Sequence, residues 1–110
     1  MSAVRHVVLL RFKPEIDEST RATVIADLTE LIGELVERSP GLLAGAAGRD
    51  LGLAGGAMDA ALVLDAVDAD AWTAYQLDAD HKDFVSTRLA PLLADRAAIQ
   101  FAVPAARTSP

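Results

Sequence analysis

The side chains best suited to acid/base chemistry in this sequence are its two histidines and its single tyrosine: His6, His81 and Tyr75. Histidine titrates near neutral pH, and a tyrosine hydroxyl can donate a proton to a carbonyl oxygen, so the set can support general acid/base catalysis. Cysteine is absent, which excludes thiol nucleophiles, disulfides and cysteine-based metal sites. No Ser-His-Asp arrangement stands out. We therefore assign His81 as the candidate base, Tyr75 as the acid or carbonyl anchor, and His6 as a residue lining the pocket.

Each of these residues also has a purely structural interpretation. A lone histidine on an apolar strand is more often a hydrogen-bonded core residue. Tyr75 can be a half-buried core aromatic with a hydrated hydroxyl, and His81 can be a surface residue in the first turn of a helix. Both interpretations remain open from the residues alone.

A metal site is not expected. Asp78, Asp80 and Asp83 form an acidic cluster, but Asp80 is available as a helix cap and no calcium-loop pattern follows. No phosphate-binding or dinucleotide-binding glycine motif occurs in the Gly-rich loop over 50–57. We predict a site without metal or cofactor.

The element that must position His6 is a strand over 4–12, which is apolar on both faces. Alternation places Val4, Val8, Leu10 and Phe12 on the same face as His6. The opposite face carries Val7 and Leu9 together with Arg5 and Arg11. A sheet open to water on one side should alternate more cleanly. We therefore expect helices to cover one face and a second copy of the chain, in a homodimer, to cover the other.

A long amphipathic helix follows, with Asp17 as its N-cap and Ser39-Pro40-Gly41 as its end. Its apolar residues recur at helical spacing: Val24, Ile25, Leu28, Leu31, Ile32, Leu35 and Val36. We expect Leu28, Leu31 and Leu35 to be buried against the sheet.

The second half of the chain repeats the strand and helix signals. Strands are predicted over 42–49, where Gly45 and Gly48 indicate a bulge or a close backbone approach, and over 58–67 and 98–103. A short helix from Asp68 carries Trp72 and Tyr75, and Asp80 is expected to cap a following helix, which Pro91 kinks or ends. The order β-α-β-β-α-β predicts an α+β, ferredoxin-like, four-stranded antiparallel sheet with helices on one face. If the second helical segment packs over the first strand, the three rings meet in one apolar pocket.

Length and charge limit the possible partners. The chain has 110 residues and a net charge of −6, which indicates one domain over 1–103 and argues against nucleic acid and acidic membrane surfaces. No apolar run reaches the length of a membrane span, and the N-terminus lacks a signal-peptide pattern, so a cytoplasmic protein is expected. Residues 104–110 are small and polar and are predicted to form a disordered tail.

The sequence resembles the stress-responsive α/β-barrel domain family, often called Dabb. The resemblance rests on the opening run Val4 to Lys13, the Pro40-Gly41 turn, Gly48-Arg49-Asp50, Leu62-Val63-Leu64, Tyr75, His81, Phe84 and Pro91-Leu92. It covers about Val4 to Val103. The family implies a ferredoxin-like monomer whose sheet packs against that of a second monomer to form a barrel.

The resemblance also implies a site. Some plant members look like polyketide cyclases that use a tyrosine and a histidine at the spacing of Tyr75 and His81, with another histidine at the position of His6. Two features depart from that pattern: Asp78 and Ala79 replace the first two positions of a His-Pro-x-His motif, and Ala60 replaces a third-strand histidine.

Three functional hypotheses follow. The first is a protein that binds or acts on a small apolar or aromatic carbonyl compound, with the ligand contacted by His6, Val8, Leu10, Trp72 and Phe84. The second is a non-catalytic dimeric stress-response domain in which the same residues complete a core. The third is a cofactor-free or haem-using monooxygenase on the same dimeric fold, which the presence of Trp72 keeps open. An enclosed cavity reached by Tyr75 and His81 would favour the first hypothesis.

Overall fold

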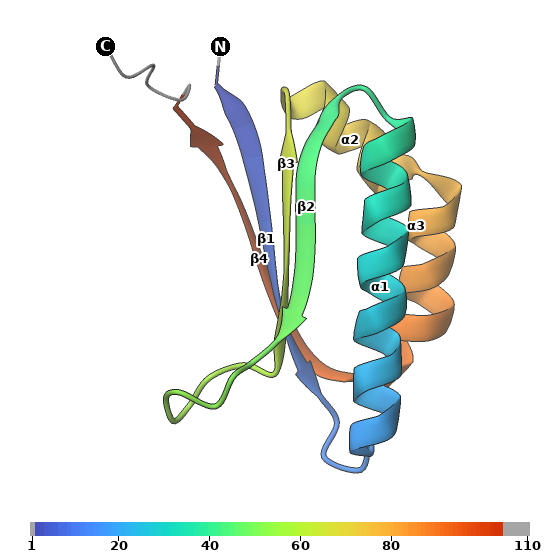
Figure 1. Cartoon of the computed structure of the whole chain (residues 1–110), viewed down its shortest axis with the longest axis vertical. Coiled ribbons are helices and arrows are strands. Elements are labelled where there is room, and N and C mark those ends of the chain that lie inside the picture. Colours follow the sequence, from blue (N-terminus) through green and yellow to red (C-terminus); the bar gives the residue numbers. More distant parts are fainter. Residues whose placement is uncertain (1, 105–110) are drawn as a thin grey trace.

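The computed structural model describes residues 2–104. Its elements are, in order, β1 (Ala3–Phe12), α1 (Glu18–Arg38), β2 (Leu42–Arg49), β3 (Ala60–Ala66), α2 (Ala69–Leu77), α3 (Ala79–Phe84), the π-helical turn η1 (Val85–Leu89), the 3₁₀ turn η2 (Ala90–Leu92) and β4 (Leu93–Val103). The strands form one antiparallel sheet in the order β2-β3-β1-β4. The three helices lie on one face of this sheet (Figure 1). The predicted ferredoxin-like arrangement is confirmed.

Helix α1 forms where the apolar periodicity predicts it. The Asp17 side chain accepts a hydrogen bond from the Thr20 backbone N–H at 2.8 Å and so caps the first turn. Leu28 and Leu35 are buried, but Leu31 is only partly buried, as is Val36. Leu31 lies at the margin of the apolar stripe rather than at its centre, so the prediction of full burial was wrong for this residue.

Strand β1 divides its side chains as predicted. His6, Val8, Leu10 and Phe12 are buried beneath the helices. On the other face, Leu9 keeps 39% of its surface exposed within the single chain. The helical face therefore holds the core, and the outer face is apolar without a cover from this chain.

The glycines of β2 serve the approach of α1. A Cβ atom at Gly45 would overlap Cγ2 of Ile32 and would also lie 3.2 Å from Cδ1 of Leu64. Glycine at this position lets the Ile32 side chain of α1 pack directly against the strand backbone. The pairing of β2 with β3 also shifts register between Leu42 and Ala44, so both the predicted close approach and a strand irregularity are present. No atom lies within 4 Å of a Cβ added at Gly48.

Two boundaries differ from the sequence-based expectation. Asp78, not Asp80, caps α3, because its carboxylate accepts hydrogen bonds from the backbone N–H groups of Asp80 and His81 at 2.9 and 3.1 Å. The third strand covers 60–66 instead of 58–67.

Strand β4 is longer than predicted. It begins at Leu93 instead of Ala98, because antiparallel pairing with β1 continues through Asp95 and Arg96, which apolar alternation did not include. The predicted disordered tail lies, from residue 105 on, outside the described residues. Within residues 2–104, no helix is long and apolar enough to cross a membrane.

Candidate binding and catalytic site

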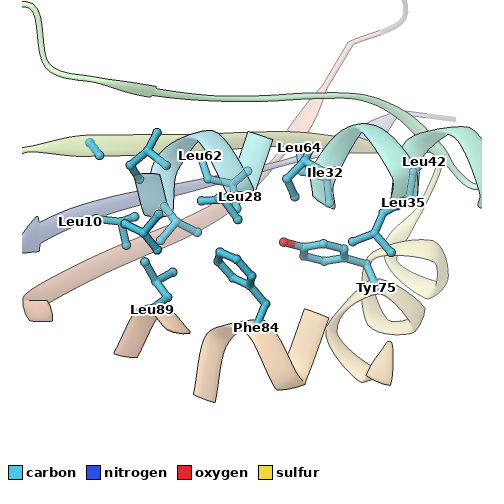
Figure 2. Close-up of a cluster of buried hydrophobic side chains, with 14 of the residues drawn as sticks. Leu10, Leu28, Ile32, Leu35, Leu42, Leu62, Leu64, Tyr75, Phe84 and Leu89 are labelled. Atoms are coloured by element: carbon cyan, nitrogen blue, oxygen red, sulfur yellow. The ribbon is translucent and has the colours of Figure 1, made fainter. Parts of the chain in front are cut away.

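Three aromatic rings from three different elements converge on the helical face of the sheet. The ring centroids of Tyr75 on α2 and His81 on α3 are 4.2 Å apart, and those of His6 on β1 and Tyr75 are 6.0 Å apart. His6 and Tyr75 are each only 3% exposed. Figure 2 shows the Tyr75 hydroxyl directed into the layer between the sheet and the helices. The fold thus brings together the three residues that the sequence marked as candidates.

These rings line a small cavity. Its volume is about 100 Å³, and its walls are mostly apolar. The lining residues are His6, Val8, Leu10, Leu28, Leu62, Tyr75, Gln76, His81, Val85, Leu89 and Arg96. The cavity combines apolar walls with a small number of convergent polar groups, and this composition is typical of small-molecule sites.

The N-terminus of α3 fixes the position of His81. Asp78 caps this helix and also pairs with Arg38 at the end of α1, with a nitrogen–oxygen distance of 3.0 Å. A second guanidinium nitrogen of Arg38 lies 2.9 Å from Asp80. The carboxylates of the α3 N-terminus are therefore held against α1, and His81 follows in the first turn.

Two polar atoms of the triad are buried without a hydrogen-bond partner among the described residues: Tyr75 Oη and His81 Nδ1. An unsatisfied buried polar atom costs about 1–3 kcal/mol of stability. Native proteins satisfy most such atoms, so these exceptions call for an explanation. A ligand oxygen or proton in the cavity would supply the missing partners.

Burial sets the protonation states. It lowers the pKa of His81 below its usual value, while the nearby Asp78 carboxylate and the backbone of Gln76 oppose part of that effect. It also lowers the pKa of His6, with further lowering by the positive charge of Arg96 and by His81. Burial raises the pKa of the Tyr75 hydroxyl. At neutral pH the site therefore holds neutral imidazoles, which can accept protons, and a protonated phenol, which can donate a hydrogen bond.

His6 has a partner on the neighbouring strand. The side-chain nitrogen Nε2 of Gln100 lies 2.8 Å from His6 Nδ1, and the two residues are paired across β1 and β4. An amide nitrogen can only donate, so in this amide assignment Nδ1 is the acceptor and the imidazole proton resides on Nε2. This contact fits a pocket-shaping role for His6 and also the structural interpretation.

Five of the residues predicted to form the site line the cavity: His6, Val8, Leu10, Tyr75 and His81. The other two do not. Trp72 packs edge-on against His6 with the ring centroids 5.9 Å apart, and Phe84 belongs to the apolar cluster in Figure 2. Both support the walls rather than forming them.

Sequence reasoning missed several lining residues, of which Arg96 and Gln76 are polar. A signal for Arg96 existed, because alternation extended backward from Gln100 places Ala98 and Arg96 on the face of His6. The predicted start of the strand at Ala98 concealed it. Within residues 2–104, no group of three or more His, Cys, Asp or Glu side chains is arranged to hold a metal ion.

Several solved structures are similar to this fold. A dimeric ferredoxin-like protein of unknown function from Thermobifida fusca is 37% identical, with a TM-score of 0.81 over 93% of this chain and 92% of its own. A Dabb family protein from Mesorhizobium loti is 19% identical, with a TM-score of 0.73 over 96% and 100%. The hydroxynitrile lyase of Passiflora edulis is 17% identical, with a TM-score of 0.74 over 97% and 98%.

No curated protein matches the sequence. The family comparison does: residues 4–103 match Dabb, the stress responsive A/B barrel domain. That match covers nearly all of the described residues, including β1 with His6, α2 with Tyr75 and α3 with His81. The chain therefore belongs to the Dabb, stress responsive A/B barrel domain family.

Proposed function

We propose that the cavity binds a small apolar or aromatic carbonyl compound and that Tyr75 and His81 act on it as an acid/base pair. The observation that carries this proposal is the pair of buried polar atoms without partners, Tyr75 Oη and His81 Nδ1, on rings only 4.2 Å apart at one cavity. Leaving both unsatisfied lowers stability. Such a cost is typical of functional sites.

The chemistry follows from the protonation states. Because burial raises the pKa of Tyr75, its hydroxyl stays protonated and can donate a hydrogen bond to the carbonyl oxygen of a ligand. Because burial lowers the pKa of His81, its neutral imidazole can take a proton from the carbon next to that carbonyl. The C–H bond breaks, its electron pair moves into the enolate, and the phenol of Tyr75 stabilises the oxygen that gains negative charge.

The size of the cavity limits the substrate. At about 100 Å³ it is smaller than the 300–1,000 Å³ typical of drug-sized ligand sites. A compact compound, or one that holds only its reacting end in the cavity, fits this volume. A polyketide cyclase activity is a narrower form of the same proposal, and the departures at Asp78, Ala79 and Ala60 leave Tyr75 and His81 as its acid/base pair.

Another protein with this fold is an enzyme. The Passiflora edulis structure is a hydroxynitrile lyase, so the fold accommodates catalysis in at least one protein. At 17% identity that likeness concerns the fold alone. The proposal for this chain therefore rests on its own residues.

The test is a binding screen of small aromatic ketones and aldehydes, followed by turnover measurements on the compounds that bind. Tyr75→Phe and His81→Asn should each lower turnover by about 10²–10⁴-fold while the fold is retained. Lys82→Gln is a matched control, because Lys82 is exposed on α3 and does not line the cavity. Wild-type turnover in both site variants would refute acid/base catalysis by this pair.

The second candidate is a non-catalytic dimeric domain, and the contact between Gln100 and His6 favours it. It predicts that the site variants lose stability without any specific change in activity. Trp72, the residue that suggested a monooxygenase, does not line the cavity, and we propose no such activity.

We also propose that the chain forms a homodimer through the outer face of its sheet. Ile99 and Phe101 are 59% and 45% exposed there, beside Leu9. Burying each such side chain contributes about 1.5–3 kcal/mol, and related structures, including that from Thermobifida fusca, are described as dimeric.

Analytical ultracentrifugation at micromolar concentration tests this assembly. The wild type should sediment as a dimer, and Leu9→Asp should dissociate or unfold it. Leu77→Asp introduces the same charge at an exposed leucine of α2, on the helical layer, and should stay dimeric. A wild-type monomer would refute the proposal.

A further inference from the structure

Arg96 is the cationic residue of the cavity lining. It lies on β4 opposite Leu10 of β1 in the antiparallel register, and residues paired in this way share a face of the sheet. Leu10 is buried beneath the helices, so Arg96 belongs to the helical face as well. Arg96 is itself exposed, so the cavity reaches solvent beside this lining residue.

The guanidinium of Arg96 is not used by the fold. Five arginines form ion pairs among residues 2–104: Arg5, Arg21, Arg38, Arg49 and Arg88. Arg96 has no such pair, and no side-chain hydrogen bond of its guanidinium occurs in the same part of the chain. The neighbouring acids are already engaged: Asp78 pairs with Arg38, and Asp95 accepts a hydrogen bond from the Arg96 backbone N–H.

We propose that Arg96 binds the carboxylate of the ligand, so that the site takes a small apolar or aromatic carboxylic acid in its anionic form. This inference rests on the proposed function, in which the cavity holds a small molecule, and it adds the ligand's charge. A guanidinium recognises a planar carboxylate through two parallel hydrogen bonds. The apolar body of the ligand would contact Leu10 and Leu89, which line the cavity.

The charge distribution supports an anion. The chain as a whole carries a net charge of −6, which repels anions from most of its surface. At the cavity, the two histidines are neutral near pH 7 because burial lowers the pKa of each. Arg96 is therefore the lining residue that carries a full positive charge near pH 7. Because Arg96 is exposed, a carboxylate bound to it can remain partly hydrated while the body of the ligand is buried.

Arg96 also provides a spectroscopic readout. Its positive charge lowers the pKa of both His6 and His81. A bound carboxylate would neutralise that charge, so the pKa of each histidine should rise when the anion binds. Besides these groups, the site holds Tyr75 and the carboxylate of Asp78, which is already paired with Arg38.

The experiment titrates benzoate and, as a neutral analogue of similar size, benzyl alcohol into the full chain, with binding followed by NMR. The wild type should bind benzoate at least about tenfold more tightly than benzyl alcohol, the scale of one charge-assisted hydrogen bond. Arg96→Gln should remove this preference and the histidine pKa rise. Arg96→Lys should retain part of both, because a lysine keeps the charge but not the bidentate geometry. Lys82→Gln removes one positive charge elsewhere on the surface and should behave as the wild type.

The outcomes separate the two proposals. If both probes bind with equal affinity in the wild type and in Arg96→Gln, the carboxylate assignment is wrong while the small-molecule site stands. If neither probe shifts the signals of Tyr75, His6 or His81 at millimolar concentration, both proposals are overturned. If Lys82→Gln loses the preference for benzoate as fully as Arg96→Gln, the effect is general surface charge and the role of Arg96 is refuted.

Discussion

Two regions on the same face of the sheet differ in how closely their side chains pack and in whether their buried polar atoms have partners. Beneath α1, Ile32 and Leu35 are each 1% exposed, and Gly45 of β2 allows the helix to approach the strand without a gap. Beneath α2 and α3, Tyr75 and His81 border a cavity and leave polar atoms without partners. One face of the sheet therefore supports a closely packed apolar core beneath α1 and, beneath α2 and α3, a mostly apolar cavity bordered by polar atoms without partners.

The difference shows which region of this protein contributes most to its stability. Close packing of α1 gains burial of apolar surface, whereas the second region gives up packing and hydrogen bonds. A protein can hold an unsatisfied site only if the rest of the fold is stable enough to tolerate it. We therefore expect substitutions beneath α1 to affect stability strongly, and substitutions around Tyr75 to affect chemistry more than stability.

The largest effect expected beneath α1 is at Ile32. Ile32→Ala removes side-chain atoms from a fully buried position where α1 meets β2 and β3. The free energy of unfolding should fall by about 2–5 kcal/mol, the range for such truncations in packed cores. Urea denaturation at a fixed protein concentration measures this loss, since the proposed dimer would make stability depend on concentration.

Leu31→Ala is the matched control on the same helix. Leu31 is only partly buried, so its truncation should cost clearly less than that of Ile32. An equal loss for the two variants would mean that the helix face is rotated from the one described, and the contrast between the two regions would fail.

A smaller effect is expected from pH. Burial lowers the folded-state pKa of His6 and His81 below their usual value near 6.5. The unfolded chain therefore binds more protons between the unfolded and folded pKa values, and stability rises with pH across that interval. Stability should be fully present above about pH 6.5 and should be lost progressively as the pH falls through the lowered folded pKa values.

Thermal denaturation at several pH values between about 7.5 and 5 checks this sign. Over this range the His6→Asn, His81→Asn double variant should show a flatter pH dependence than the wild type, whatever its absolute stability. Asp78, Arg96 and Tyr75 are the other charged or titratable groups around these rings, and the double variant keeps all three. A wild-type protein that becomes more stable as the pH falls would contradict the burial of neutral imidazoles.

The comparison also explains what the sequence could predict. The region beneath α1 was predictable because apolar periodicity and the cap Asp17 act over neighbouring residues. Burial of Leu31 was overestimated because periodicity gives a stripe and not its edges. The glycine pattern of β2 predicted a close approach, and Gly45 provides it.

The site was only partly predictable. His6, Tyr75 and His81 stood out by residue type, and their convergence followed from packing α2 over β1. Arg96 and Gln100 could not be assigned in the same way, since their positions depend on the register between β1 and β4, a pairing across more than ninety residues of chain. The cavity itself depends on side-chain packing between residues of β1, α1, β3, α2, α3, η1 and β4, which no local pattern encodes.

The smallest expected effect on stability, and the one most diagnostic of the second region, is at Tyr75. Tyr75→Phe removes a buried hydroxyl that has no partner among the described residues and keeps the ring that packs against His81. Removing an unsatisfied polar atom relieves its desolvation cost, so the free energy of unfolding should change by no more than about 1 kcal/mol, in the direction of greater stability. Tyr75→Ala, which deletes the ring as well, should cost about 3–5 kcal/mol and shows that the position is packed. A loss of about 2 kcal/mol or more for Tyr75→Phe, the scale of a buried partner left unpaired, would mean that the hydroxyl is bonded within the fold. Tyr75 would then resemble the closed core beneath α1, and the case for a ligand at this cavity would lose its main support.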